Sequence, residues 1–106
     1  MPQTAEHLMR SRYTAHVLVA VDYLKETLWP KHQPYFDPVA VGEWAARNHW
    51  AGLTVIATNL GSEKDRDGTV LFEARYLANG RLDTHRELSR FRKKAGRWYY
   101  VEALPE

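Results

Sequence analysis

Glu87 is the residue whose type and surroundings best suit acid-base chemistry. It is the only acidic side chain in a basic stretch that runs from Arg86 to Arg97. A carboxylate in an apolar cavity, with a tyrosine or histidine as proton donor, could abstract a proton next to a carbonyl group. Tyr13 and His85 are the candidate donors. Such a base needs burial that raises the pKa of its carboxyl group.

Arg12 argues against a base at this position. It falls on the apolar side of a helical repeat, and a buried guanidinium group needs an acidic partner. Glu87 is the expected partner because it shares one strand face with Ser89 and Phe91. We predict an ion pair between Arg12 and Glu87 beneath the helix, which would hold the carboxylate ionised and lower its pKa. Its role could be to orient a ligand, but we favour a structural role because buried pairs are often structural.

Aromatic side chains are the second group with a chemical use. Their spacing allows them to line a cone between helices and a sheet, and Tyr23, Trp44 and Phe91 could contribute to it. The candidate pocket consists of Arg12, Tyr13, Trp29, Trp50, Phe72, Glu87, Ser89, Trp98 and Tyr100. Such a cone could hold a small apolar or amphipathic ligand. Aromatic residues at these spacings are more often core, however, and a filled cone would bind nothing.

Residue type excludes several other chemistries. The chain has no cysteine, which excludes disulfides, thiolate zinc sites and a cysteine nucleophile. The five histidines are scattered and lack metal-ligand spacing, so we expect surface histidines and no metal site. The sequence contains no glycine-rich phosphate loop, and we expect no cofactor.

The basic stretch from Arg86 to Arg97 raises the question of nucleic acid binding. Phosphate contacts, with stacking on Phe91 or Trp98, would provide it. The alternative is a solvated outer strand face with a charged hairpin tip, which also discourages edge aggregation. We favour this alternative and do not expect nucleic acid as a partner. The formal charge of the whole chain is +2, a weak field that says little about partners.

Length and composition describe one ordinary folded domain. Of the 106 residues, 44% are hydrophobic and 26% are charged, which suffices for a single core. We assign residues 1–106 to one domain. No apolar run approaches the roughly 20 residues that cross a bilayer, and the first residues lack a signal-peptide pattern. We therefore expect a cytoplasmic protein without membrane contact.

The elements that must position these side chains begin with helices. Apolar residues recur at helical spacing from Thr4 to Leu28 without proline or glycine. The candidate N-caps are Thr4, Asp22 and Asp37, the last followed by Pro38 in a first helical turn. The predicted helices span residues 4–21, 23–29 and 39–48. Residues 31–41 are predicted to form a connection.

Four strands are predicted after the helices. Period-two alternation and β-branched residues predict strands over residues 50–60, 69–77, 81–93 and 97–103. Asn79-Gly80 and Ala95-Gly96 are hairpin turns, which make consecutive strands antiparallel neighbours. The face of the second strand that should turn toward the helices carries Val70, Phe72, Ala74 and Tyr76. The order of elements predicts an α+β cone, in which helices of residues 4–48 pack on a curved antiparallel sheet of four or slightly more strands, residues 50–104.

Six sequence blocks occur in a fixed order along almost the whole chain. They are Glu6-His7-Leu8-Met9-Arg10-Ser11-Arg12-Tyr13, Asp22-Tyr23-Leu24, Trp50-Ala51-Gly52-Leu53-Thr54-Val55, Phe72-Glu73-Ala74-Arg75-Tyr76, Ser89-Arg90-Phe91 and Trp98-Tyr99-Tyr100. In this order they resemble the middle domain of the bacterial YchJ family. The resemblance implies a cystatin-like, nuclear-transport-factor-2-like fold.

The resemblance brings no assigned activity with it. Members of the family are usually flanked by short zinc-binding SEC-C motifs rich in cysteine. This chain departs from that pattern because it has no cysteine cluster. An excised domain and a naturally short member are both consistent with the departure.

The leading functional hypothesis is a non-catalytic module that binds a small ligand or a protein partner. The alternative is a small-molecule enzyme that uses Glu87 as acid or base in the cone, and a raised pKa of Glu87 in an open pocket would favour it. A third hypothesis is a structural homodimer. In that dimer an outer sheet face bearing Leu71, Leu77 and Leu88 would pair across a two-fold axis.

Overall fold

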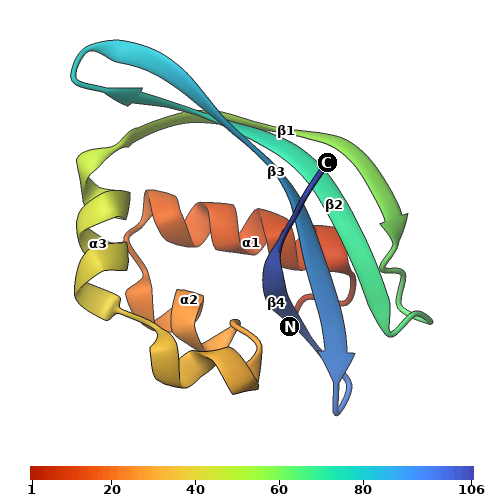
Figure 1. Ribbon diagram of the computed structural model, residues 1–106. Coiled ribbons are helices and arrows are strands. Elements are labelled where there is room, and N and C mark those ends of the chain that lie inside the picture. The colour runs from red at the N-terminus through yellow and green to blue at the C-terminus, as the bar shows by residue number, and fades with distance from the viewer.

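A computed structural model describes residues 1–106 and has helices followed by a four-stranded sheet (Figure 1). The helical segments are α1 (Ala5–Val17), α2 (Val21–Glu26), the 3-10 helix η1 (Pro30–Tyr35) and α3 (Pro38–Arg47). The strands are β1 (His49–Leu60), β2 (Asp67–Ala78), β3 (Arg81–Lys94) and β4 (Arg97–Leu104). They form one sheet in the order β1-β2-β3-β4, and every neighbouring pair is antiparallel. The predicted α+β architecture is confirmed.

Side-chain caps fix the starts of the two longer helices. The hydroxyl oxygen of Thr4 accepts a hydrogen bond of 3.1 Å from the backbone N–H of His7, which caps α1. The carboxylate of Asp37 accepts from two backbone N–H groups at the start of α3, and Pro38 follows it in the first turn. Both caps are as predicted.

Three predictions between these helices are wrong. Asp22 is not an N-cap, because it lies in the first turn of α2, whose N-cap position is Ala20. The chain leaves α1 earlier than predicted, through Val19 in the left-handed region at φ 54°, so α2 begins sooner. Residues 30–35 form the helix η1 instead of an irregular connection, since Pro30 takes the first helical position.

The sheet curves over α1, and the helices cover only its concave face (Figure 1). The predicted inward face of β2 is confirmed for Val70, Phe72 and Ala74, which are all buried. The core cluster on this face consists of Ala5, Leu8, Met9, Val70, Phe72, Ala74, Phe91 and Trp98. One continuous core therefore joins α1 to the inner face of the sheet.

A bulge in β1 changes which of its residues face the helices. Trp50 lies opposite Tyr76 and Leu53 lies opposite Ala74, so the register shifts by one residue at Gly52. Gly52 has φ 142°, a conformation that side-chain-bearing residues rarely adopt. Because residues directly opposite in an antiparallel pair share a face, the bulge lets both Trp50 and Leu53 point inward.

The outer edge of β4 is covered by the segment that leaves α2. The N–H of Tyr100 donates to the carbonyl oxygen of Thr27 at 2.9 Å, and the N–H of Trp29 donates to the carbonyl oxygen of Tyr100 at 2.8 Å. These bonds place the C-terminal end of α2 beside the sheet. None of the helices combines the length and apolar character needed to cross a bilayer.

Candidate ligand-binding cavity

A cavity of about 350 Å³ lies between the helices and the concave face of the sheet. Side chains from α1, α3 and all four strands line it, and most of them are apolar or aromatic. Its volume is within the range of roughly 300 to 1,000 Å³ that small-molecule pockets occupy. The cone is therefore not filled by its own side chains.

Seven of the nine predicted pocket residues line this cavity. They are Arg12, Tyr13, Trp50, Phe72, Glu87, Ser89 and Tyr100. Trp98 does not, because it is 1% exposed in the core and its indole N–H donates to the carbonyl oxygen of Gln3 at 3.0 Å. Trp29 does not either, because it packs edge-on against Tyr99 at 5.9 Å on the far side of β4 and contacts Arg92.

Six further residues line the cavity and were not among the nine. They are Met9, His16, Trp44, Ala74, His85 and Phe91. The expectation that all histidines lie at the surface is wrong for His16, which lines the cavity and whose pKa is lowered by partial burial. A signal for it was present in the sequence, since His16 follows Arg12 by four residues and therefore shares its helix face.

Aromatic side chains form one wall of the cavity. Trp44 and Trp50 pack edge to face with ring centroids 5.1 Å apart, and His16 contacts both rings. Tyr13 packs on Trp50 at 6.0 Å, and its hydroxyl oxygen accepts a hydrogen bond of 3.0 Å from the N–H of Gly52. The indole N–H of Trp50 donates to the carbonyl oxygen of Ala45. These contacts hold the wall in one arrangement.

Polar residues of β3 form a line from the mouth of the cavity to its floor. His85 has 42% of its side chain exposed and Glu87 has 16%, whereas Ser89 is 1% exposed. Alternation along a strand places these three residues on one face, two positions apart. The cavity is therefore entered beside His85 and ends near Ser89.

Glu87 accepts hydrogen bonds from three side chains. Nε2 of His85 lies 3.0 Å from one carboxylate oxygen, while the hydroxyl groups of Tyr100, at 2.9 Å, and Ser89 donate to the other. Burial by itself would raise the pKa of Glu87, but these three donors outweigh it and lower the pKa below its usual range. The same contacts raise the pKa of His85, against the effect of burial. At neutral pH Glu87 is therefore an ionised carboxylate that accepts three hydrogen bonds.

The predicted ion pair between Arg12 and Glu87 is wrong, although both residues line the cavity. Nη1 of Arg12 donates to the carbonyl oxygen of Leu24 at 2.9 Å and to Oγ1 of Thr27 at 2.6 Å. These acceptors belong to the C-terminal end of α2, where free carbonyl groups favour a cation. The guanidinium group also lies over the ring of Tyr100, 4.8 Å from its centroid. Burial lowers the pKa of Arg12 to about 10, so it stays charged at neutral pH.

A helical layer that encloses an aromatic-lined cavity against a curved antiparallel sheet defines a nuclear-transport-factor-2-like domain. The chain belongs to the family described as "YchJ, middle NTF2-like domain", whose model matches residues 4–103. The predicted family membership is confirmed. No group of three histidine or acidic side chains comes together as a metal site.

Bacterial proteins of unassigned function are similar to this chain. The UPF0225 protein GSU1048 of Geobacter sulfurreducens is 43% identical over 99 residues, and the match covers 93% of this chain but only 62% of that protein. A UPF0225 protein of Chromobacterium violaceum is 43% identical over 101 residues, which covers 95% of this chain and 73% of the relative. The chain thus spans less than two thirds of the first relative.

Two solved structures have the same fold. The solution structure of RPA3114, a SEC-C motif containing protein from Rhodopseudomonas palustris, has a TM-score of 0.88 and 37% identity, covering 96% of this chain and 78% of that one. The crystal structure of a SEC-C motif containing protein from Psychrobacter arcticus has a TM-score of 0.82 and 38% identity, covering 93% of this chain and 59% of that one.

Proposed function

We propose that this domain is a non-catalytic module that binds a small amphipathic molecule in its cavity. The observation that carries the proposal is the cavity itself: about 350 Å³ of space with aromatic walls and one line of polar groups. Pockets that bind small molecules combine apolar walls with a few polar groups in this way. A domain selected only for its stability would fill such a space, because unfilled core volume costs free energy.

The state of Glu87 favours binding over catalysis. A general base must have a pKa near the working pH and a free lone pair aimed at the substrate. Both oxygens of Glu87 already accept hydrogen bonds, and its pKa is lowered despite burial, which by itself would raise it. The alternative of an enzyme with Glu87 as acid or base would therefore require its donors to be displaced first.

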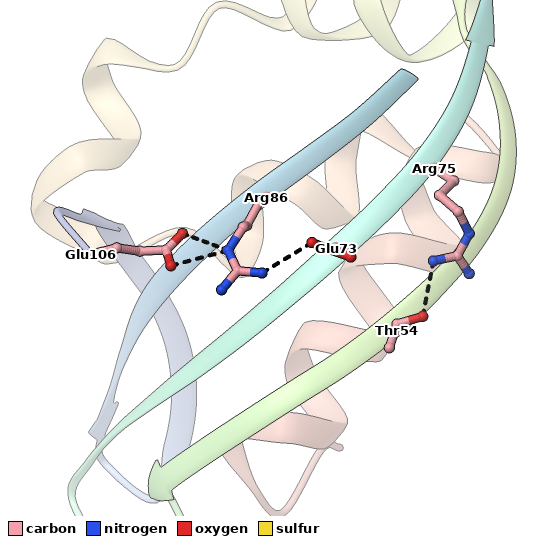
Figure 2. Close-up of polar contacts among 5 residues, drawn as sticks. All are labelled: Thr54, Glu73, Arg75, Arg86 and Glu106. Atoms are coloured by element: carbon pink, nitrogen blue, oxygen red, sulfur yellow. Dashed lines mark hydrogen bonds and ion pairs between the residues drawn. The ribbon is translucent and has the colours of Figure 1, made fainter. Parts of the chain in front are cut away.

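The outer face of the sheet does not favour nucleic acid as a partner. Arg86 donates to Glu106 at 2.9 Å and to Glu73 at 3.0 Å, so acidic side chains flank it on both sides (Figure 2). Arg90 likewise pairs with Glu102 at 3.0 Å. Phosphate binding would have to replace these internal partners. A homodimer through Leu71, Leu77 and Leu88 of this face stays a prediction, which light scattering would test.

Protein-observed NMR with a library of small fragments tests the proposal. We expect bound fragments to shift the indole N–H resonances of Trp44 and Trp50 and the backbone resonance of Gly52, which is bonded to Tyr13. Ala74→Leu fills the cavity from β2 and should abolish these shifts, because Ala74 is a buried lining residue. Ala46→Leu, on the exposed side of α3, is the matched control and should leave them unchanged.

Two outcomes would contradict small-ligand binding. One is a fragment screen in which resonance shifts scatter over the surface and never concentrate at the cavity. The other is an Ala74→Leu protein that is folded and binds the same fragments as tightly as the wild type.

A further inference from the structure

The guanidinium group of Arg12 has two nitrogens that no protein group uses. Only Nη1 donates within the chain, to Leu24 and Thr27. No side-chain nitrogen or oxygen of the protein is both sealed from solvent and without a partner, so neither Nε nor Nη2 is completely sealed. The space that Arg12 lines is the cavity. Two donors on one edge of a charged, planar group therefore stay available to a ligand.

Contacts with protein groups hold this edge in place. The bonds from Nη1 to the end of α2 fix one side of the guanidinium group, and the ring of Tyr100 supports its face at 4.8 Å. The Nε and Nη2 edge of an arginine matches the two oxygens of a carboxylate in a fork of parallel hydrogen bonds. An arginine immobilised in this way loses little conformational freedom when it binds such a group.

Glu87 does not compete for that role. Its two oxygens are already occupied by His85, Ser89 and Tyr100, and no ion pair joins it to Arg12. These donors fill three of the about four acceptor positions of a carboxylate. Arg12 therefore keeps two unused donors, whereas most of the hydrogen-bonding capacity of Glu87 is already used.

The charged and aromatic ends of the cavity lie at opposite edges of the sheet. Arg12 lies over Tyr100 on β4, whereas Trp50 belongs to β1, and these two strands are the outer members of the order β1-β2-β3-β4. Trp44 and Tyr13 contact Trp50 and complete the apolar side. A ligand that satisfies both ends is charged at one end and apolar at the other.

We propose that the cavity binds a small organic acid, whose carboxylate pairs with Nε and Nη2 of Arg12 and whose apolar or aromatic body packs on Tyr13, Trp44 and Trp50. This inference rests on the proposed small-ligand function and adds the chemical class of the ligand. It also assigns Arg12 as the residue that selects that class. A cationic group does not fit beside Arg12, because the guanidinium group repels it.

Three probes that differ only at one end test the assignment. They are 3-phenylpropionate, 3-phenylpropanamide and 3-phenylpropylamine, which end in a carboxylate, a neutral amide and an ammonium group. Each is titrated into the isotopically labelled full chain at neutral pH, and the indole N–H resonances of the four tryptophans are followed. Trp44 and Trp50 report on the cavity, whereas Trp29 and Trp98 lie outside it and serve as internal controls.

We expect the affinity for the acid to be at least about tenfold higher than for the amide, because the neutral amide cannot form the two charge-assisted hydrogen bonds with Arg12. The amine should bind more weakly than the acid, because its ammonium group is repelled by the guanidinium group of Arg12. In Arg12→Gln the acid should lose its advantage, so that acid and amide bind with similar affinity. The amide's retained affinity shows that the variant still forms the cavity. Arg10→Gln, which removes an exposed arginine on the other side of α1, should leave the preference unchanged.

Equal affinity of the acid and the amide in the wild type would overturn the assignment and leave small-ligand binding intact. An acid that does not shift Trp44 and Trp50 would also overturn it, while the fragment screen with Ala74→Leu decides the proposed function separately. Preference for the acid that survives in Arg12→Gln would show that another residue selects the carboxylate.

Discussion

The hydroxyl group of Tyr100 donates a hydrogen bond of 2.9 Å to Oε2 of Glu87. The ring of the same tyrosine supports the guanidinium group of Arg12. Tyr100 therefore connects the two opposite charges of the cavity without bringing them into direct contact. Both charges line the cavity instead of closing it with an ion pair.

Tyr100→Phe removes the hydroxyl group and keeps the ring beneath Arg12. We expect it to lower the free energy of unfolding by about 1 to 3 kcal/mol, because a hydrogen bond to a charged, largely buried acceptor is lost. The pKa of Glu87 should rise, since one of the three donors that lower it is gone. Urea unfolding at neutral pH and an NMR titration of Glu87 measure the two effects.

Tyr99→Phe is the matched control for this substitution. Tyr99 is the neighbouring residue of β4, and its hydroxyl group makes no hydrogen bond within the chain, so the change should stay within about 0.5 kcal/mol. An unaltered pKa of Glu87 in Tyr100→Phe would contradict the role given to the hydroxyl group.

The pair of His85 and Glu87 makes stability depend on pH. Folding raises the pKa of His85 above its ordinary value of 6.5, so its contribution is fully present below 6.5 and is lost as the pH rises through the raised value. Folding lowers the pKa of Glu87 below 4.5, so its contribution is present above 4.5 and is lost only in more acidic solution. The pair therefore stabilises the fold most between these two values.

His85→Gln tests this dependence, because glutamine can donate to Glu87 but does not titrate. At pH 5.5 the wild type should have a higher free energy of unfolding than the variant. This difference should be about 0.2 to 1 kcal/mol larger at pH 5.5 than at pH 8.5, as for a partly exposed ion pair. Arg12 is charged at both pH values, and the comparison is made in a His16→Gln background, because His85 is one of the groups that lower the pKa of His16. A difference that is independent of pH would refute the pairing.

The fold was predictable because its signals are local. Asn79-Gly80 and Ala95-Gly96 do form tight turns, with positive φ at both residues of each pair. The caps Thr4 and Asp37 fix helix starts through side chains only two or three residues away. The bend at Val19 is different, because a β-branched residue in the left-handed region follows from the packing of α1 against α2 and not from its own preference.

The site was predictable only in part. Alternation along a strand predicts which face of the sheet a side chain lies on, but not whether it lines the cavity or is buried in the core. Trp98 and Tyr100 alternate on the same face of β4, yet Trp98 is sealed beneath the N-terminal segment and Tyr100 reaches the cavity. The partner of Arg12 was missed because a backbone carbonyl, that of Leu24, leaves no mark in the sequence. The bulge in β1 did have a sequence signal, because an isolated glycine within a strand pattern indicates a bulge.

Thr27→Val tests the anchor of Arg12. The hydroxyl group of Thr27 accepts from Arg12 at 2.6 Å and donates to the carbonyl oxygen of Tyr23, and the residue is 1% exposed. Valine keeps the shape but leaves Arg12 short of one acceptor, so we expect a loss of about 1 to 3 kcal/mol in the free energy of unfolding.

The control for this anchor is Thr14→Val. Thr14 also donates to the carbonyl group four residues before it, but it is exposed and contacts no charged group through that hydroxyl. Its substitution should change stability by less than about 0.5 kcal/mol. Equal losses from the two variants would mean that Thr27 contributes only its bond to Tyr23 and that Arg12 is held elsewhere.

Gly52→Ala tests the bulge that turns Trp50 into the cavity. At φ 142° a side chain is strained, and the new Cβ would lie 2.7 Å from Nη2 of Arg75. Nη1 of the same arginine donates to the hydroxyl oxygen of Thr54 on the outer face (Figure 2). We expect a loss of about 1 to 3 kcal/mol and a shifted indole resonance of Trp50. In an Arg75→Ala background most of the loss should persist, because the backbone strain remains.

Gly96→Asn is the control, because Gly96 has φ 76° in an open turn and the substitution should be tolerated. A stable Gly52→Ala protein with an unchanged Trp50 resonance would show that the bulge does not depend on glycine.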